Sequence, residues 1–424
     1  MSPPSSSRRK TPRLISLYTG AGGLDLGFEA VGFKTTVAVE LDPEAVATLR
    51  HNRDWPVIDR DIHAVSSREL LKVAHLREGE ADVLIGGPPC QPFSKAGYWS
   101  SGDTLRLDDP RAGTLAAYLR ILRDALPKAF LLENVPGLAY RGKEEGLYLI
   151  QRTVDTINRE RGVRYTLSIG KLNAADYGVP QLRERVFVVG EREGKEFRFP
   201  QPTHGLESQL LPLQPYTTAW DSIGDLVEEK DTADLELRGK WADLLPSIPE
   251  GENYLWHTNR GGGLQLFGWR RRYWSFLLKL SKGEPSWTIQ AQPGPAIGPF
   301  HWKNRRLSPR ELCRIQTIPD DYVVLGNLGA VQRQLGNAVP SALAEVLARA
   351  IRCQLLTDPV SMVSSLIPKA RRPIPEPEPL AVVPRKYRHL VEDHEDHPGT
   401  GKGYAAKRRQ LEPSAPEYPV LPLA

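Results

Sequence analysis

The chain has 424 residues, of which 40% are hydrophobic and 25% are charged, and its formal net charge is +5. This composition is typical of a globular protein of about two domains, it permits a polyanionic partner, and no apolar run reaches the ~18 residues of a membrane span. Three cysteines in so long a chain make no disulfide framework, so we expect free thiols in a reducing, cytoplasmic setting, and no Cys/His spacing predicts a metal site.

The chain begins with a short arm and then a glycine turn between a strand and a helix. Residues 1–12 are rich in proline and serine with one basic cluster, so we expect a flexible basic arm. Residues 14–33 read as a strand, a GxGG turn that starts at Gly20, and an amphipathic helix. Glu40 follows twenty positions after Gly20, at the spacing where an acid binds ribose hydroxyls. Because the turn is not GxGxxG, it favours a nucleoside cofactor without phosphates; an ordinary turn without a ligand is the alternative.

The motif GGPPCQPFS, residues 86–94, follows the apolar strand 81–85. Its prolines stiffen the backbone before Cys90, and its glycines allow another surface to approach closely. A cysteine held at a strand exit is well placed for nucleophilic attack, although a buried structural cysteine is the better interpretation of PPC alone. The polar segment 91–112 behind it has the length of a functional loop, and a helical pattern containing Leu115 follows.

Two further strand patterns carry polar groups. The apolar run in KAFLLENV ends at Glu133, where an open α/β sheet binds ligands, although this residue alone would be interpreted as part of a turn. Arg183 and Arg185 belong to the motif QxRxR, and their spacing places both side chains on the same side of a strand. A solvated edge paired through Glu184 is the alternative.

The composition changes near residue 192. Between 192 and 305 the alternation of strands and helices stops, prolines and glycines are frequent, and seven of the nine tryptophans occur. Three consecutive arginines stand among aromatic residues there, which is typical of a nucleic-acid surface; a small hydrophobic core with snorkelling arginines is the alternative. Helical periodicity returns in 306–352. The remainder, 353–424, is rich in proline with mixed charge, so we expect a mostly disordered or extended tail, and deletion from Pro368 onward should leave methylation near normal.

In this order the motifs resemble those of DNA (cytosine-5) methyltransferases of the bacterial restriction-modification type, over roughly residues 13–352. The resemblance implies an α/β, Rossmann-like sheet that binds S-adenosylmethionine, made by 13–191 and 306–352. It also implies a smaller, irregular target-recognition domain at 192–305. The implied reaction transfers a methyl group from S-adenosylmethionine to C5 of a cytosine flipped out of a specific double-stranded DNA sequence, through a covalent adduct between Cys90 and C6.

The resemblance assigns residues to three tasks. The catalytic residues are Cys90, Glu133, which faces N3 of the base, Arg185, which holds its O2 side, and Arg183, which supports the loop and a phosphate. The cofactor is assigned to Tyr18 (usually Phe in the family), Gly20, Gly22, Gly23, Leu24, Glu40, Leu41, Asp61, Ile62, Pro89, Leu115, Asn337 and Val339. Contacts with DNA are assigned to Ser94, Arg106, Arg270, Arg271, Arg272 and Thr288. From its own chemistry Asp61 could equally be a helix cap or a surface acid, and Leu115 could equally be a core leucine.

Two other functions were weighed. Methylation of a tRNA cytosine on the same fold is disfavoured by the large segment 192–305, and a silent DNA-binding regulator is disfavoured because Cys90 and Glu133 are both present. We expect double-stranded DNA as the partner, no membrane and no metal, and a monomer associated with the nucleoid. A cognate restriction endonuclease as a genetic partner stays open, as does the DNA target.

Overall fold

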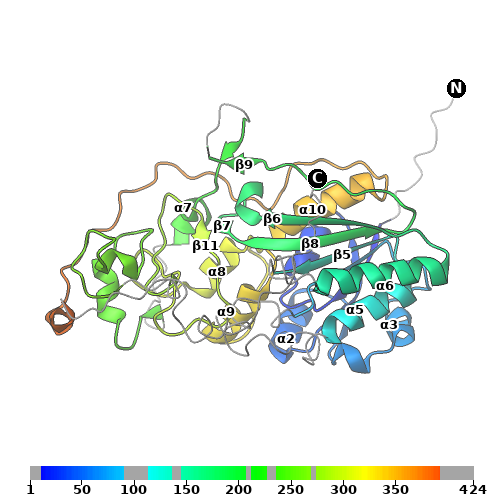
Figure 1. The fold of residues 1–424 in the computed structure, drawn as a ribbon, viewed down its shortest axis with the longest axis horizontal. Coiled ribbons are helices and arrows are strands. Elements are labelled where there is room, and N and C mark those ends of the chain that lie inside the picture. The colour runs from blue at the N-terminus through cyan, green and yellow to red at the C-terminus, as the bar shows by residue number, and fades with distance from the viewer. Residues whose placement is uncertain are drawn as a thin grey trace, which may run out of the picture.

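The computed structural model describes residues 11–89, 113–135, 145–206, 212–226, 235–268 and 274–391. Its centre is a seven-stranded sheet in the order β3-β2-β1-β4-β5-β8-β6, with helices on both faces (Figure 1). The strands are β1 Arg13–Leu17, β2 Lys34–Val39, β3 Val57–Ile58, β4 Val83–Gly86, β5 Ala129–Asn134, β6 Thr166–Asn173 and β8 Glu184–Glu191. This architecture confirms the predicted α/β, Rossmann-like fold class.

The sheet is parallel from β3 to β5, whereas β8 runs antiparallel to both of its neighbours, β5 and β6. Side chains that follow one another on a strand point to opposite faces. Leu14 of β1 accordingly packs in one hydrophobic cluster and Ile15 in another, so the central strands are apolar on both faces. Because the central strands are parallel, the carboxyl ends of β1, β2, β4 and β5 lie along one edge.

Helices cover the two faces of the sheet (Figure 1). One face carries α3 Ser67–Val73, α5 Gly113–Ala125 and α6 Glu145–Arg161, and the other carries α1 Gly23–Glu29 and α10 Ser341–Gln354. The helix α2 Pro43–Asn52 connects β2 to β3, and the short helices η1 Ile62–Ala64 and η5 Ala174–Tyr177 follow β3 and β6. The helices α1 and α10 meet at Gly27, where an added Cβ would lie 2.4 Å from the Cβ of Ala344. No helix in the described ranges is long and apolar enough to cross a membrane.

A small lobe, made of residues 212–226, 235–268 and 274–305, contains little regular structure. Its elements are β10 Gln214–Pro215, α7 Ala219–Ile223, η6 Gly224–Leu226, η8 Ala242–Ser247, η9 Tyr254–His257 and β11 Ser286–Trp287. The strand β11 pairs with β7 Gln181–Leu182, and β10 pairs with β9 His204–Gly205. One hydrophobic cluster joins Trp302 of the lobe to α8 Pro309–Ile315 and α9 Leu328–Asn337, and a second contains Phe300 and Tyr387.

The chain after α10 is docked on the rest of the molecule. Cys353 and Gln354 still belong to α10, and residues 359–391, here called the C-terminal strap, run across to the far end of the small lobe (Figure 1). The strap ends in the short helix η11 Arg385–Leu390, in which Tyr387 is 2% exposed. Of the two forms expected for the tail, disordered or extended, residues 359–384 take the extended one, and they are docked on the rest of the chain. Prolines keep the strap extended, and contacts with the rest of the chain hold it in place.

Candidate active site

A cavity of about 950 Å³ opens at the carboxyl edge of the sheet, where open α/β folds bind ligands. The segments after β1, β2, β3, β4 and β5 line it, together with the end of α9. The predicted site residues on its wall are Tyr18, Gly20, Gly23, Leu24, Glu40, Leu41, Asp61, Ile62, Pro89, Glu133, Arg185, Asn337 and Val339. Residues assigned separately from the sequence thus meet at one site.

Several predicted residues lie outside the described ranges. These are Cys90, Ser94, Arg106, Arg270, Arg271 and Arg272, together with residues 1–10 of the arm and residues 392–424 of the tail. The described chain does reach Pro89, which lines the cavity directly before Cys90. Within the same ranges, no three His, Cys, Asp or Glu side chains are grouped so that they could hold a metal ion.

The turn after β1 is shaped for a ligand. Tyr18 has a positive φ of 54°, and its hydroxyl donates a 2.6 Å hydrogen bond to the carbonyl of Thr114, which fixes the ring on the wall of the cavity. Gly20 has a φ of 56°, and an added Cβ would have no neighbour within 4 Å. Its backbone therefore faces open space in a conformation that side chains rarely adopt.

Glu40 organises the loop after β2. Its Oε2 accepts a 2.7 Å hydrogen bond from the amide of Gly20, and its Oε1 accepts 2.8 Å bonds from the amides of Leu41 and Asp42. A carboxylate offers about four acceptor positions, so Oε2 retains room for a hydroxyl of a ligand. The carboxylate is thus both a brace for the glycine turn and a candidate ribose acceptor.

Asp61 both caps a helix and lines the cavity, so its position agrees with both of the roles that the sequence left open, helix cap and cofactor acceptor. It caps η1, and its Oδ1 accepts 2.9 Å and 2.7 Å bonds from the backbone amide and the ring Nδ1 of His63. These bonds to His63, the backbone bond first, hold the pKa of Asp61 below its ordinary value. Because Asp61 also lines the cavity, an ionised acceptor stands beside the side chain of Ile62.

Glu133 lies where β5 ends and packs against the loop that leads to Cys90. A Cβ on Gly87 would lie 2.6 Å from Oε2 of Glu133, so only glycine leaves room for this carboxyl group. The side-chain amide of Asn134 donates to the carbonyl of Pro88 at 3.5 Å, which further ties the end of β5 to the loop. The glycine and proline residues before Cys90 thus place that loop against the acid.

Arg185, the second residue of β8, pairs with Glu133 across the two antiparallel strands. Its Nε lies 2.8 Å from Oε1 of Glu133, and both side chains are nearly buried. Burial raises the pKa of Glu133 above its ordinary value of 4.5, although Arg185 and Arg183 act in the opposite direction. The pair therefore presents a carboxyl group that can hold a proton, next to a fixed guanidinium.

Arg183 lies in the interior of the protein. Its side chain is fully buried and donates to the carbonyls of Ile289, at 3.3 Å, and Gly336, at 2.7 Å. Because the guanidinium is buried in this structure, nothing here supports a contact with a phosphate, and the assignment stays a prediction. The strand β7 ends at Leu182 and β8 begins at Glu184, so Arg183 lies between two strands and the two-residue alternation does not apply to it. It ties this junction to the small lobe and to α9.

Three other assigned residues do not line the cavity. Gly22, with a φ of 79°, caps α1, and an added Cβ would lie 3.1 Å from the hydroxyl of Tyr322. Leu115 is 4% exposed and belongs to the core between α5 and the sheet. Thr288 donates a 2.6 Å hydrogen bond to the carbonyl of Leu182, next to the β11–β7 pair. The assignments of Gly22 and Leu115 to the cofactor therefore stay predictions, and the bond made by Thr288 joins the lobe to the sheet domain.

The structure adds residues to the cavity that the sequence did not single out. Thr114, rather than Leu115, lines the wall, and His63 stands beside Asp61. Arg333 of α9 also lines it and pairs with Asp42 at 2.7 Å across 291 positions of sequence. His63 had a weak signal in its place after Asp61, whereas no local pattern could reveal Arg333.

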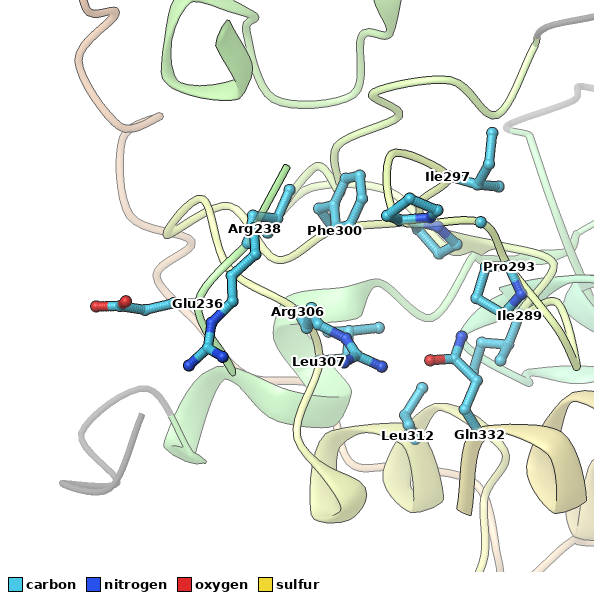
Figure 2. Close-up of a pocket in the computed structure, with 14 residues that line it drawn as sticks. Glu236, Arg238, Ile289, Pro293, Ile297, Phe300, Arg306, Leu307, Leu312 and Gln332 are labelled. Carbon is cyan, nitrogen blue, oxygen red and sulfur yellow. The ribbon is translucent and has the colours of Figure 1, made fainter. Parts of the chain in front are cut away.

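A second cavity of about 430 Å³ lies between the small lobe and the helices α8 and α9 (Figure 2). Much of its wall is apolar, with Ile289, Leu307 and Leu312, and the side chain of Arg306 extends into it towards Gln332 (Figure 2). In the described part of the chain, hydrogen bonds involve the backbone of Arg306 but not its guanidinium. This cavity therefore offers a cation, partly shielded from solvent, to a ligand.

The fold is similar to that of solved structures. A variant of Spodoptera frugiperda DNMT2 has a similar structure, with a TM-score of 0.55 at 17% identity, over 80% of this chain and 99% of that chain. The Dnmt2 methyltransferase of S. pombe is also similar, with a TM-score of 0.54 at 15% identity, over 81% of this chain and 99% of that chain. The chain therefore shares the fold of these two proteins.

Sequence comparison identifies the family. Residues 12–353 match the family model for C-5 cytosine-specific DNA methylase. The Type II methyltransferase M.SacI of Streptomyces achromogenes is 40% identical over 370 residues, which cover 81% of this chain and 93% of that protein. The Type II methyltransferase M.AquIA of Picosynechococcus is 44% identical over 236 residues, which cover 53% of this chain and 93% of that protein. The chain belongs to the C-5 cytosine-specific DNA methylase family and is a DNA (cytosine-5) methyltransferase.

Proposed function

We propose that the protein methylates C5 of a cytosine flipped out of double-stranded DNA, with S-adenosylmethionine as the methyl donor and Cys90 as the nucleophile. The observation that carries this proposal is the meeting of Glu133, Arg185 and the loop that leads to Cys90 at the cavity that Gly20 and Glu40 line. The target atom of cytosine is inaccessible inside a stacked duplex, so the base has to leave the stack to reach this site.

The proposed mechanism follows from the low nucleophilicity of C5 in cytosine. Its C5 is a weak nucleophile until the Cys90 thiolate adds to C6, which interrupts the conjugation of the ring and places electron density on C5. Glu133 holds a proton at N3 and so stabilises the charge that this addition creates, while Arg185 binds the O2 side of the base. After C5 is methylated, its proton leaves to water and the bond between Cys90 and C6 breaks, which restores the thiolate and the aromatic ring.

The first cavity fits S-adenosylmethionine. Glu40 and Asp61 present carboxylate oxygens at the carboxyl ends of β2 and β3, where a ribose and an exocyclic amine can donate to them. Tyr18 and Ile62 supply flat or apolar surfaces for the adenine ring, and the open side of Gly20 leaves space beside the turn. When bound, the cofactor supplies an electrophilic methyl group on its sulfonium.

The proposed role of Glu40 leads to a prediction for cofactor affinity. Replacing Glu40 by glutamine removes an ionised acceptor and should weaken S-adenosylhomocysteine binding by roughly 10- to 100-fold, the loss expected for a charge-assisted hydrogen bond. Calorimetry measures this change. Glu44→Gln is the matched control, because Glu44 pairs with Arg333 in the same region without lining the cavity. Equal affinity of the Glu40 variant and the control would mean that the cofactor binds elsewhere.

We further propose that the second cavity faces DNA. Two arginines, Arg238 and Arg306, line it; Arg306 extends into it without a side-chain hydrogen bond to the described residues and is of the type that binds phosphates and guanine edges. Arg306→Ala should lower discrimination at one target position by about 1–3 kcal/mol if it reads a base. If it holds a phosphate, all sequences should weaken alike, and the salt slope should fall by about 1. Methylation of a randomised DNA library, followed by sequencing, measures both.

The control for the Arg306 variant is Arg310→Ala, because Arg310 of α8 is bound to Asp320 in the turn after that helix and does not line the cavity. If Arg306→Ala and Arg310→Ala gave the same target profile and the same salt slope as the wild type, the second cavity would not be a DNA-binding surface.

Bisulfite sequencing tests the reaction itself. DNA from cells that express the wild type should contain cytosines protected from conversion in one recurring sequence, and DNA from cells that express Cys90→Ala should contain none. The recurring sequence would also show whether a cognate restriction endonuclease with that target should be sought. Unprotected DNA together with methylated tRNA would support the RNA alternative instead.

A further inference from the structure

The C-terminal strap lies beyond the region that matches the family, which ends at residue 353. It begins on the sheet domain, passes β9 and α7, and ends at the far side of the small lobe (Figure 1). Four sets of contacts hold it along this path, and the last three involve the small lobe. The strap therefore connects the sheet domain to the small lobe, in addition to the segments that link these two parts directly in sequence.

The first set of contacts fixes the strap to α10. Glu345 is buried in that helix, and its carboxylate accepts bonds from the amide of Ser365, at 2.8 Å, and the amide of Leu366, at 3.0 Å. Burial raises the pKa of Glu345, but hydrogen bonds from Ser364, Ser365 and Arg349 outweigh that effect and hold it below the ordinary value. This end of the strap therefore has a fixed position on the sheet domain.

The second set holds the middle of the strap at α7. Asp221 is 3% exposed, and its Oδ1 accepts bonds from the amide of Arg371, at 2.6 Å, and from the guanidinium of Arg372, at 2.8 Å. Its Oδ2 accepts bonds from the backbone and hydroxyl of Thr218 in the capping box of the same helix. The strap thus completes the hydrogen bonding of a buried carboxylate at the start of the small lobe.

The third set is a buried charge cluster to which the strap contributes an acid. Glu378 lies 3.1 Å from Nζ of Lys282 and 3.0 Å from Nζ of Lys303, and its amide donates to Glu250 at 2.8 Å. The side chains of Lys282 and Glu250 are only 4% and 5% exposed. Lys279 is buried close by, where burial lowers its pKa to about 8 although Glu250 and Glu378 raise it. Without Glu378 the two buried lysines, Lys279 and Lys282, would retain Glu250 as their carboxylate partner, which leaves buried positive charge uncompensated, and the exposed Lys303 would lose its ion pair.

The fourth set places an aromatic ring in the core of the small lobe. Tyr387 stacks on Trp241, with the ring centroids 5.6 Å apart, and its hydroxyl donates to the carbonyl of Lys240 at 2.6 Å. Tyr387 belongs to the same hydrophobic cluster as Phe300, and Phe300 lines the second cavity. The end of the strap therefore supports a wall of the surface that we propose for DNA.

We propose that the C-terminal strap positions the small lobe on the sheet domain, so that DNA binding and target selection depend on residues outside the family match. The proposal rests on the proposed DNA-binding function of the lobe. Glu133 and the cofactor cavity lie away from these contacts, so the strap acts on how DNA is held and not on the chemical step. Glu378 and Tyr387 are positioning residues in this scheme.

The experiment compares full-length Glu378→Gln and Tyr387→Ala with Glu376→Gln. Glu376 is the matched control, because its carbonyl accepts from Lys282 while its exposed side chain makes no contact in the described part of the chain. Both test variants should raise KM for DNA by about tenfold, the loss expected for one charged hydrogen bond or one buried ring contact, and should methylate non-target sequences more often. At saturating DNA, kcat and the affinity for S-adenosylhomocysteine should stay within about twofold of the wild type.

Hydrogen–deuterium exchange supplies a readout that does not depend on activity. Residues 235–268 should exchange faster in Glu378→Gln than in Glu376→Gln, while β1, β4 and β5 exchange as in the wild type. The proposal is overturned if KM, target profile and exchange in both test variants match the control, or if cofactor affinity and kcat fall as much as DNA binding does. A wild type that methylates no DNA would instead refute the proposed function, and the exchange data would still decide whether the strap positions the lobe.

Discussion

Replacing Cys90 by alanine is expected to lower the rate of methyl transfer by at least about 10⁴-fold, the scale seen when a covalent nucleophile is removed. The other two cysteines cannot take over its role. Cys313 is 4% exposed in α8, and burial raises the pKa of its thiol to about 12. Cys353 lies in the last turn of α10, and its Sγ accepts a 3.4 Å hydrogen bond from the amide of Val360. Binding of DNA and of S-adenosylhomocysteine should survive the substitution, because the proposed task of the thiol begins only after the base is bound.

The covalent step has its own measurement. A duplex with 5-fluorocytosine at the target should trap the wild type in a complex that resists denaturing electrophoresis, because fluorine at C5 cannot leave as a proton. Cys353→Ala should trap the duplex as the wild type does, and Cys90→Ala should not. A wild type that methylates cytosine without forming a trapped complex would show that the reaction does not pass through the adduct.

The cofactor side of the site could be predicted because its signals are local. Gly20, Glu40 and Asp61 each follow one of the parallel strands β1, β2 and β3, and parallel strands bring their carboxyl ends to the same edge. Once the three turns are recognised in order, the topology assembles them without further information. The meeting of Glu133 with Arg185 was predicted only through the resemblance, because it depends on the antiparallel pairing of β8 with β5.

The sequence is least informative where the direction of a side chain depends on its tertiary surroundings. The spacing of Arg183 and Arg185 predicts one shared face, but the strand is interrupted at Arg183, which turns into the interior. Helical periodicity shows that Leu115 is on a buried face, yet it cannot tell the core from the cavity, and the neighbouring Thr114 lines the cavity instead. A sequence pattern gives the direction of a side chain only when the element containing it is known to continue.

The docking of the strap could not be predicted, for a different reason. Composition indicates whether a segment can fold by itself, and a proline-rich segment of mixed charge cannot. It does not indicate whether that segment docks on a surface that is already folded. The decisive contact joins Glu378 to Lys282 across 96 positions, and neither residue belongs to a local motif. The buried lysines of the small lobe were the one available signal, because a buried cation implies a partner somewhere in the chain.

Replacing Glu133 by glutamine is expected to lower kcat by about 10²- to 10⁴-fold, the usual contribution of a positioned general acid. The amide keeps the size of the side chain against Gly87 but has no acidic proton to share with N3 of the base. Affinity for S-adenosylhomocysteine should change little, because the cofactor acceptors Glu40 and Asp61 are untouched. Single-turnover kinetics on a duplex with one target site measures the chemical step. Adding Gln181→Glu to Glu133→Gln should not restore the rate, because the buried side chain of Gln181 is bonded to Gln316.

The pH dependence identifies Glu133 more sharply than the rate alone. Burial raises its pKa above the ordinary value of 4.5, while Arg185 and Arg183 lower it. Because the protonated form is the active one, the wild-type rate should fall as pH rises through this raised pKa, and the limb due to Glu133 should be absent in Glu133→Gln. Arg185→Gln removes the guanidinium 2.8 Å from the carboxylate, so the pKa of Glu133 should rise further and the alkaline limb should move to higher pH, even though the maximum rate falls. An alkaline limb that persists unchanged in Glu133→Gln, or that moves to lower pH in Arg185→Gln, would show that another group supplies the proton.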